Sequence, residues 1–228
     1  MLAQSPTRVR DVNANAWLVF SADQTVRGPW GVHAEVNVRR ANAGATWQQF
    51  QLHGAATYRI SPRVQAAFGL IWMRNYPYGA FPAARNSIER RTHEQLTIRQ
   101  APWKGLEFEL RMRLDQRWLQ QFENRTRYQF RALLPLGRLD ALGRQSYLLA
   151  ADEVLFHLPP KRGALYFNQN RAIAGFGRRF GPADRLEFHY MHQFLYQRNG
   201  IVVESNHTLR IQFSTTAPLF WRRKDNGT

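Results

Sequence analysis

Charged residues near the middle of the chain occupy every second position, and their types allow two kinds of chemistry. These positions are Glu107, Glu109, Arg111, Arg113, Asp115 and Arg117, followed by Arg125, Arg127 and Arg131. Arginine guanidinium groups form bidentate ion pairs with carboxylates, which could build a rigid network. A surplus of arginine along a narrow pore would instead favour the passage of anions.

Histidine is the other residue type that could carry chemistry. His189 and His192 are three residues apart, so on a strand they point to opposite faces and do not chelate one ion together. Four histidines could face inward, with Glu89, Glu107 or Glu153 to orient one of them; they are His33, His53, His93 and His189. We interpret these histidines as hydrogen-bonded structural residues.

No motif marks a catalytic nucleophile or a cofactor site. Ser87, Ser146 and Ser205 lie in ordinary loop or strand-end positions, and no glycine-rich phosphate loop, HExxH or GxSxG pattern is present. The chain has no cysteine, which excludes disulfides and cysteine-based metal centres. We therefore expect no enzyme activity, no cofactor and no metal, with a lipid-modifying outer-membrane enzyme as the weaker alternative.

The elements that carry these residues are predicted to be β-strands, because apolar and polar residues alternate with a period of two. Between Gly105 and Trp118 the charged positions alternate with Leu106, Phe108, Leu110, Met112 and Leu114. Strand-like patterns also occur at residues 13–20, 31–39, 47–60, 64–76, 87–100, 125–131, 145–156, 166–180, 186–190 and 207–213. Many exceed the usual length of about 5–6 residues and reach the ~9–11 that a transmembrane strand needs.

The connections between these segments alternate between tight turns and looser loops. Glycine and proline mark turns near residues 27–31, 60–63, 101–105 and 181–184, and longer segments lie near 40–47, 77–87, 118–124, 157–165 and 197–205. Tryptophans fall near strand ends, with Trp30 and Trp103 on the turn side and Trp47 and Trp118 on the loop side. Short periplasmic turns, longer extracellular loops and two aromatic girdles are typical of outer-membrane barrels.

These patterns predict an all-β fold, an antiparallel transmembrane β-barrel. Eleven segments can be counted, but bacterial single-chain barrels have even strand numbers. We therefore predict about twelve strands, with ten as the alternative. The apolar face, which includes Phe68, Leu70 and Trp72, would meet lipid. Arg90, Glu94 and one of the adjacent pair Asp152 and Glu153 depart from this facing.

The polar face would line the lumen of the barrel. The arginines expected there are Arg39, Arg59, Arg91, Arg99, Arg111, Arg113, Arg117, Arg125, Arg127, Arg131, Arg171 and Arg210. The carboxylates are Glu35, Glu89, Glu107, Glu109, Asp115, Glu153 and Glu187. We single out as lumen-lining candidates Glu107, Glu109, Arg111, Arg113, Asp115, Arg117, Arg125, Arg127, Arg131, Glu153 and Arg171. A salt-bridge network between rows on neighbouring strands and an anion-selective, porin-like channel both remain open.

The overall charge first suggests a nucleic-acid protein. The chain has 228 residues and a formal charge of +16, and 29 of its 32 basic residues are arginine. The arginines, however, alternate with acids instead of forming one basic patch, so we expect no nucleic-acid partner. A soluble β-barrel or β-sandwich that binds anionic ligands or nucleic acid remains the structural alternative. No apolar run is long enough for a membrane-spanning helix.

Several short motifs resemble, in order and spacing, a bacterial family catalogued as domain of unknown function 2490. They are residues 110–117 (LRMRLDQR), 125–131 (RTRYQFR), 152–156 (DEVLF), 167–171 (FNQNR) with Gly175, and 206–209 (NHTL). The resemblance covers roughly residues 11–214 and implies an outer-membrane β-barrel without established activity or catalytic residues. One departure is that the chain continues past Phe213, the expected closing aromatic residue, to Thr228.

We expect three segments. Residues 1–10 form an N-terminal extension in which Met1–Pro6 resembles the end of a signal peptide, residues 11–214 form the barrel, and residues 215–228 form a basic tail with Arg222, Arg223 and Lys224. The apolar loop from Pro77 to Pro82 could fold into the barrel mouth or contact a partner. We expect the outer membrane of a Gram-negative bacterium as location, with outer-membrane lipid, lipopolysaccharide and other membrane proteins as partners. The function expected is a narrow arginine-lined channel or a structural or assembly component.

Overall fold

A computed structural model describes residues 8–80, 86–103, 105–118, 122–158, 167–197 and 201–218, and strands make up most of them. The strands are β1 (Val9–Arg27), β2 (Trp30–Ala41), β3 (Thr46–Arg59), β4 (Val64–Asn75), β5 (Ser87–Trp103), β6 (Leu106–Trp118), β7 (Phe122–Leu136), β8 (Arg144–Leu158), β9 (Phe167–Phe180), β10 (Asp184–Tyr196) and β11 (Val202–Thr215). A 3-10 turn, η1 (Asn42–Gly44), joins β2 to β3. None of the described residues forms a helix long and apolar enough to cross a membrane. The predicted signal-peptide remnant at Met1–Pro6 and the basic residues Arg222–Lys224 lie outside the described residues.

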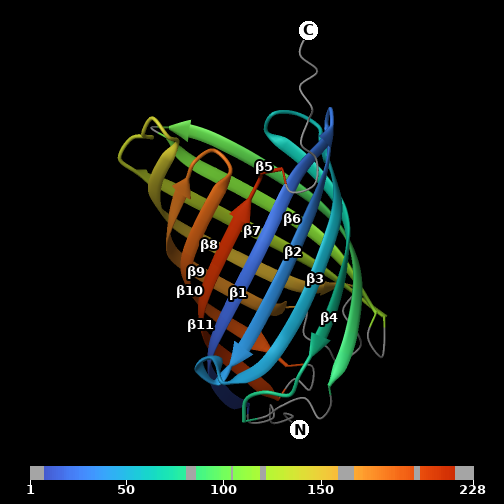
Figure 1. Cartoon of the computed structure of the whole chain (residues 1–228). Coiled ribbons are helices and arrows are strands. Elements are labelled where there is room, and N and C mark those ends of the chain that lie inside the picture. The colour runs from blue at the N-terminus through green and yellow to red at the C-terminus, as the bar shows by residue number, and fades with distance from the viewer. Residues whose placement is uncertain are drawn as a thin grey trace.

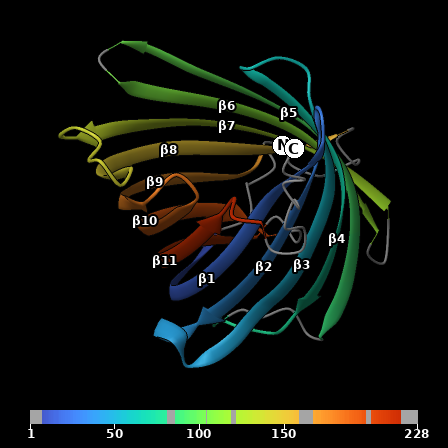
Figure 2. The same ribbon diagram turned by 45° about the horizontal axis from the view of Figure 1, so that its top comes forward.

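The sheet closes on itself into one barrel, in the order β1-β11-β10-β9-β8-β7-β6-β5-β4-β3-β2 (Figure 1). Neighbouring strands pair antiparallel except β1 and β11, which run parallel, with Val9 beside Val202 and Ala22 beside Thr215. The tilted strands wrap around a common interior, as the turned view shows (Figure 2).

The predictions of about twelve strands, with ten as the alternative, and of a wholly antiparallel sheet are wrong. Each of the eleven segments with period-two alternation corresponds to one observed strand. Strand direction alternates along the chain, so an odd number closes only through one parallel pair. Parallel ladders have evenly spaced, slanted hydrogen bonds and are only slightly less stable per residue. Even strand numbers are therefore the usual case among bacterial single-chain barrels and not a geometric requirement.

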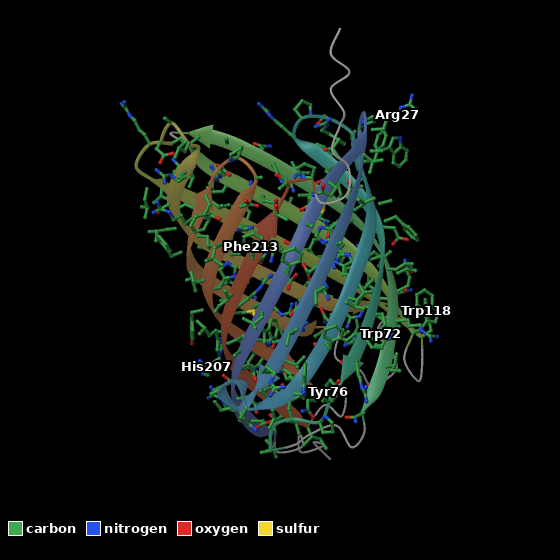
Figure 3. All side chains as sticks on the ribbon, in the orientation of Figure 1. Arg27, Trp72, Tyr76, Trp118, His207 and Phe213 are labelled. Carbon is green, nitrogen blue, oxygen red and sulfur yellow. The ribbon has the colours of Figure 1, made fainter. Side chains whose placement is uncertain are left out.

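The two ends of the barrel differ in their connections. On one end, which we call the turn side, strands are joined through residues 28–29, 60–63, 104–105, 137–143 and 181–183. On the other, the loop side, they are joined through residues 42–45, 76–86, 119–121, 159–166 and 197–201. Gly28 and Gly105 have φ values of 56° and 77°, a left-handed conformation that suits glycine. Arg27 lies at the turn side and Tyr76 towards the loop side (Figure 3).

The side chains divide between the two faces of the barrel wall as the alternation dictates. Large apolar residues on the outer face are exposed around the circumference; they include Leu18, Val36, Leu52, Phe68, Leu70, Leu110, Phe130, Leu148, Phe176, Phe188 and Leu209. Buried residues on the inner face are mostly polar or charged. This distribution is the reverse of a soluble domain, where apolar residues fill the interior.

Aromatic side chains cluster near both ends of the strands. Trp30 packs against Tyr58 at the turn side, with ring centroids 4.7 Å apart. At the loop side Trp47 packs against Tyr76 at 5.6 Å, and Trp118 packs against Phe122 at 5.5 Å. Strand bounds place Trp103 at the turn side. Aromatic rings at two levels match the interfacial girdles of membrane barrels.

The three residues expected to depart from the regular facing do lie on the outer wall. Glu94 accepts a hydrogen bond from Gln116 at 2.9 Å, and Gln116 also accepts one from Thr92 at 2.8 Å. Arg90 is exposed nearby, and Asp152 accepts hydrogen bonds from Asn170 at 3.0 Å while Glu153 points inward. The strand register through Arg90 and Glu94 is regular, so no bulge explains their facing.

Candidate functional site

The lumen is the part of the barrel where charged residues converge. The eleven lumen-lining candidates all lie on inward faces of β6, β7, β8 and β9, where they alternate with outward apolar residues. Their burial differs along the barrel axis. Buried candidates are Asp115, Arg117, Arg125, Glu153 and Arg171; half-buried candidates are Glu107, Glu109, Arg111, Arg113, Arg127 and Arg131.

Three carboxylates organise the arginines of the loop-side half of the lumen. Asp115 accepts hydrogen bonds from Arg125 at 3.1 Å and Arg127 at 2.9 Å. Glu89 accepts from Arg91 at 2.5 Å and from Arg117 at 2.6 Å. Asp115 and Glu89 therefore each pair with two guanidinium groups, which offsets part of the cost of burying these charges and leaves the arginines in excess.

Glu153 joins the network to β9. Its Oε2 atom accepts a hydrogen bond from Arg171 at 2.7 Å, and its Oε1 atom lies 3.7 Å from Arg127 and 3.8 Å from Arg111. Asp115, Glu89 and Glu153 are among the least exposed side chains of the protein, and Asp115 is 0% exposed. We call this set of residues the ion-pair network; its members are Glu89, Asp115, Glu153, Arg91, Arg111, Arg117, Arg125, Arg127 and Arg171.

Other pairs cross the lumen instead of following neighbouring strands. Arg179 on β9 donates to Glu107 on β6 at 2.6 Å. Arg131 on β7 donates to Glu187 on β10, which also accepts from Tyr147 at 2.6 Å. Glu109 pairs with Arg99 on β5 at 2.8 Å. Asp115 thus joins the charged rows of β6 and β7, whereas Glu107 and Glu109 pair with arginines of other strands.

A loop folds into the loop-side mouth. The Tyr78 hydroxyl donates to Glu204 at 2.8 Å, and a Cβ atom at Gly79 would lie 2.6 Å from an Asp11 carboxylate oxygen. Burial raises the pKa of the Tyr78 phenol, and the Glu204 carboxylate raises it further. Residues 77–80 therefore reach across to β1 and β11, as expected for one of the two proposed roles of this loop. Residues 81–85 lie outside the described part of the chain.

Towards the turn side the lumen widens into a cavity of about 500 Å³, which we call the vestibule. Ala183 and Thr216, at the turn-side rim, belong to its lining, so the vestibule opens at that end. Its wall carries Arg99, Arg111, Arg113, Arg131, Arg185, Arg210, Asp23, Glu35, Glu109, Glu187, His33, His53, His93 and His189. The small excess of positive charge makes it a cationic pocket open to water.

Comparison with known proteins identifies the family but not an activity. The model of a family described as a protein of unknown function (DUF2490) matches residues 14–206, which begin within β1 and end within β11. The chain belongs to the DUF2490 family. No curated protein and no solved structure matches the chain. The match to DUF2490 confirms the resemblance inferred from the motifs.

The DUF2490 barrel contains a buried apolar group that the charge pattern did not reveal. Trp17, Leu133, Tyr147, Leu149, Ile173 and Met191 form a cluster on the inner face. The Trp17 ring also carries the guanidinium of Arg39 at 3.8 Å and that of Arg171 at 5.6 Å. Its indole nitrogen donates to Gln48 at 2.8 Å. The cluster therefore packs against the ion-pair network and helps to fill the lumen.

One serine makes a contact of the kind found in hydrolases. The Ser205 hydroxyl lies 2.9 Å from Nε2 of His192, on the outer face of β10 and β11. The same oxygen accepts a hydrogen bond from Arg10 at 3.2 Å, and Ser205 is only 1% exposed. A covered hydroxyl that already accepts from an arginine is not presented to a substrate, so this contact supports a structural role.

Proposed function

We propose that the protein is an integral β-barrel of the bacterial outer membrane with a closed lumen, and that its role is structural or binding, not that of an open channel. The observation that supports membrane insertion is the inverted distribution of side chains. Leu70 is 61% exposed on the outer wall, whereas Asp115 inside is fully buried. In lipid this arrangement satisfies both sets of groups, because apolar side chains meet acyl chains and each described strand pairs its backbone with two neighbours in the closed sheet.

Strand length also supports insertion. The shortest strands, β2 and β4, have 12 residues and the longest, β1, has 19. A tilted strand of roughly 9–11 residues spans the hydrocarbon core of a bilayer. The remaining residues extend to the aromatic rings near the two ends. Soluble proteins seldom expose a continuous apolar surface of this extent.

The closed lumen favours a non-conducting role over the anion channel considered from the sequence. The Trp17 cluster fills the lumen from mid-strand towards the turn side, because Leu133, Tyr147 and Leu149 lie near the turn-side ends of β7 and β8. The ion-pair network and the loop carrying Tyr78 occupy the loop-side half, where the carboxylates of Asp115, Glu89 and Glu153 are at most 3% exposed. An ion passing through this half would have to separate buried arginine–carboxylate pairs. Breaking such a pair leaves an uncompensated charge and costs several kcal/mol, about 3–5 in measured cases.

The loop-side rim supplies a contact for outer-membrane lipid and lipopolysaccharide. Arg40 lies over the Trp47 ring at 4.5 Å, Arg74 over Tyr76 at 5.2 Å and Arg8 over Tyr196 at 5.0 Å. Stacking holds each guanidinium near the membrane interface, where it can bind lipid phosphates. This rim would face outward if the loop side is extracellular. We propose other membrane proteins as further partners and expect no nucleic acid.

Fractionation and conductance measurements test this proposal. We expect the protein to stay in the membrane fraction after a urea wash and to migrate differently on gels before and after boiling. Planar bilayers containing the folded protein should show no steady current in a salt gradient. Stable single-channel steps would overturn the closed lumen, with the reversal potential reporting the selectivity. A soluble protein without heat-modified mobility would overturn membrane insertion and favour the soluble anion-binding alternative.

A further inference from the structure

Three histidines and one glutamate meet on one wall of the vestibule. His33 and Glu35 project from β2, His53 from β3 and His93 from β5. One ligand atom from each of His33, Glu35 and His53 lies within 4.8 Å of the others. The fourth residue adjoins this group, because Nε2 of His53 lies 3.3 Å from Nε2 of His93. Imidazole nitrogens and a carboxylate are the donor set of many zinc sites.

The separation between the two imidazole nitrogens fits a shared metal ion. In a tetrahedral site with zinc–nitrogen bonds of about 2.0–2.1 Å, two ligand nitrogens are about 3.3 Å apart. The observed 3.3 Å between His53 and His93 equals that edge. The alternative is a hydrogen bond between the rings, which satisfies one lone pair only. If a metal ion is bound, His33 and Glu35 have to move towards His53 to complete the coordination, because their ligand atoms lie within 4.8 Å of one another, a wider limit than the tetrahedral edge of about 3.3 Å.

Two of the histidines, His33 and His93, each have a carboxylate nearby on a neighbouring strand. Asp23 on β1 contacts Nδ1 of His33 at 2.9 Å, which holds that ring with Nε2 free. Asp115 on β6 is the cross-strand neighbour of His93. Nδ1 of His93 and Oδ1 of Asp115 are both buried without a hydrogen-bond partner among the described residues. Asp115 is therefore the carboxylate placed to support His93, as metal-binding histidines generally require.

Strand β4, which lies between His53 on β3 and His93 on β5, has a glycine where the two histidines meet. Gly69 on β4 lies directly opposite His93 and also opposite Ala55 on β3. A Cβ atom at Gly69 would collide with the His93 ring and lie 2.7 Å from the Ala55 Cβ. The missing side chain therefore lets the His93 ring cross β4 and reach His53. This opening explains how residues from β3 and β5, which are not neighbours, come into contact.

We propose that His33, Glu35, His53 and His93 bind one divalent transition-metal ion in the vestibule, with Zn²⁺ as the best match. Neutral imidazoles and one carboxylate suit Zn²⁺, Cu²⁺ or Ni²⁺ and disfavour Mg²⁺ or Ca²⁺, which require more oxygen ligands. Arg113, which donates to Gln95 at 2.7 Å, lines the same vestibule. The site goes beyond the proposed structural role.

Metal titration of the folded protein tests the site. The protein is purified with a tag free of histidine, folded in detergent, checked for heat-modified mobility and titrated with Zn²⁺ by calorimetry. We expect one ion per chain with micromolar or tighter affinity. With Co²⁺ as the probe, tetrahedral coordination should give intense visible absorption. Failure of wild-type protein to bind either ion would overturn the proposal.

Variants separate this site from other lumen histidines. We expect His53→Ala to weaken Zn²⁺ binding more than about 100-fold and Asp23→Asn to weaken it about 10–100-fold, the range found for outer-shell partners. His189→Ala is the matched control, since His189 lines the same vestibule but contacts Glu187. Equal affinity in wild type and His53→Ala, or an equal loss in His189→Ala, would overturn the assignment. The zinc measurements require only that the protein folds in detergent. Their outcome can therefore be distinguished from the outcomes of the conductance and fractionation experiments.

Discussion

The two halves of the lumen use the same residue types but end in different states. In the loop-side half, Asp115 and Glu89 each bind two arginines and are nearly fully buried. In the turn-side half Glu187 is also buried, against Arg131 and Tyr147, but Asp23 is 53% exposed by its side chain and pairs with a histidine beside an open cavity. The difference teaches that residue type alone does not decide whether a barrel interior is filled. What decides it is whether each buried charge finds enough partners to exclude water.

The largest effect should come from removing one carboxylate of the filled half. Asp115→Asn removes the carboxylate charge that Arg125 and Arg127 share and leaves Arg127 with its 3.7 Å contact to Glu153, so we expect the free energy of unfolding to fall by about 3–5 kcal/mol. Urea unfolding in lipid vesicles, followed by tryptophan fluorescence, measures this loss. Asp23→Asn is the matched control, with an expected change below about 1 kcal/mol because the pair is exposed. Equal losses in the two variants would show that the halves do not differ energetically.

A smaller loss should follow from loosening the loop that closes the mouth. Tyr78→Phe removes the hydrogen bond to Glu204, and we expect a cost of about 1.5–3 kcal/mol, the range for hydrogen bonds to charged groups. Faster amide exchange in residues 76–80 should accompany it, measured by hydrogen–deuterium exchange with mass spectrometry. Tyr58→Phe, on the outer wall beside Trp30, is the control and should change neither quantity. Unaltered exchange in Tyr78→Phe would mean that the hydroxyl does not hold the loop.

The alternation of the sequence was sufficient to assign the two faces of the wall. Because a strand repeats every two residues, Arg111, Asp115 and Arg125 could be placed on one face without knowing their neighbours. The aromatic strand ends and the eleven segments followed from the same pattern. The strand total does not follow in the same way, because the even strand numbers usual in bacterial barrels favour twelve or ten over the eleven segments of the pattern. The exact partners of the charged residues depend on which strands face each other across the closed barrel.

Partners across the lumen could not be predicted for this reason. Arg131 lies opposite Glu109 on the neighbouring strand but pairs with Glu187, three strands away around the barrel. The convergence of His53 and His93 was equally hidden, because it depends on the missing side chain of Gly69 on the strand between them. Alternation predicts that both histidines face inward, but it does not predict that they come into contact. The periodicity of a sequence predicts which face of the sheet a side chain occupies. The curvature of the barrel and the stagger of its strands decide which side chains come into contact.

Filling the space beside Gly69 in the turn-side half tests whether the His93 ring needs that space. Gly69→Ala places a methyl group against the His93 ring and the Ala55 side chain, and we expect a loss of about 1–2 kcal/mol from overpacking. The same variant should weaken Zn²⁺ binding. Gly54→Ala is a close control, since a Cβ atom there meets nothing within 4 Å and points to the outer face. Urea unfolding and zinc calorimetry read both outcomes. A neutral Gly69→Ala with unchanged zinc affinity would show that His93 does not need the gap.

The smallest effect concerns an aspartate–arginine pair outside the barrel wall, which sharpens the contrast with Asp115. In the turn at residues 137–143, Asp140 accepts hydrogen bonds from the backbone of Arg144 at 2.8 Å and from its side chain at 2.7 Å. These bonds hold the pKa of Asp140 below its usual value of about 3.9. The depressed pKa means that the contribution to stability is present above the unfolded pKa and is lost as pH falls through the folded one.

Carboxyl NMR shifts followed against pH should therefore place the Asp140 midpoint below that of an unfolded peptide. Arg144→Gln should raise the midpoint only in part, because the backbone donors of Arg144 and Leu142 remain. Unfolding in urea at neutral pH should be nearly unchanged, since exposed ion pairs contribute little. An Arg144→Gln loss comparable to that of Asp115→Asn would contradict the view that burial, and not the ion pair itself, separates the filled half from the rest of the molecule.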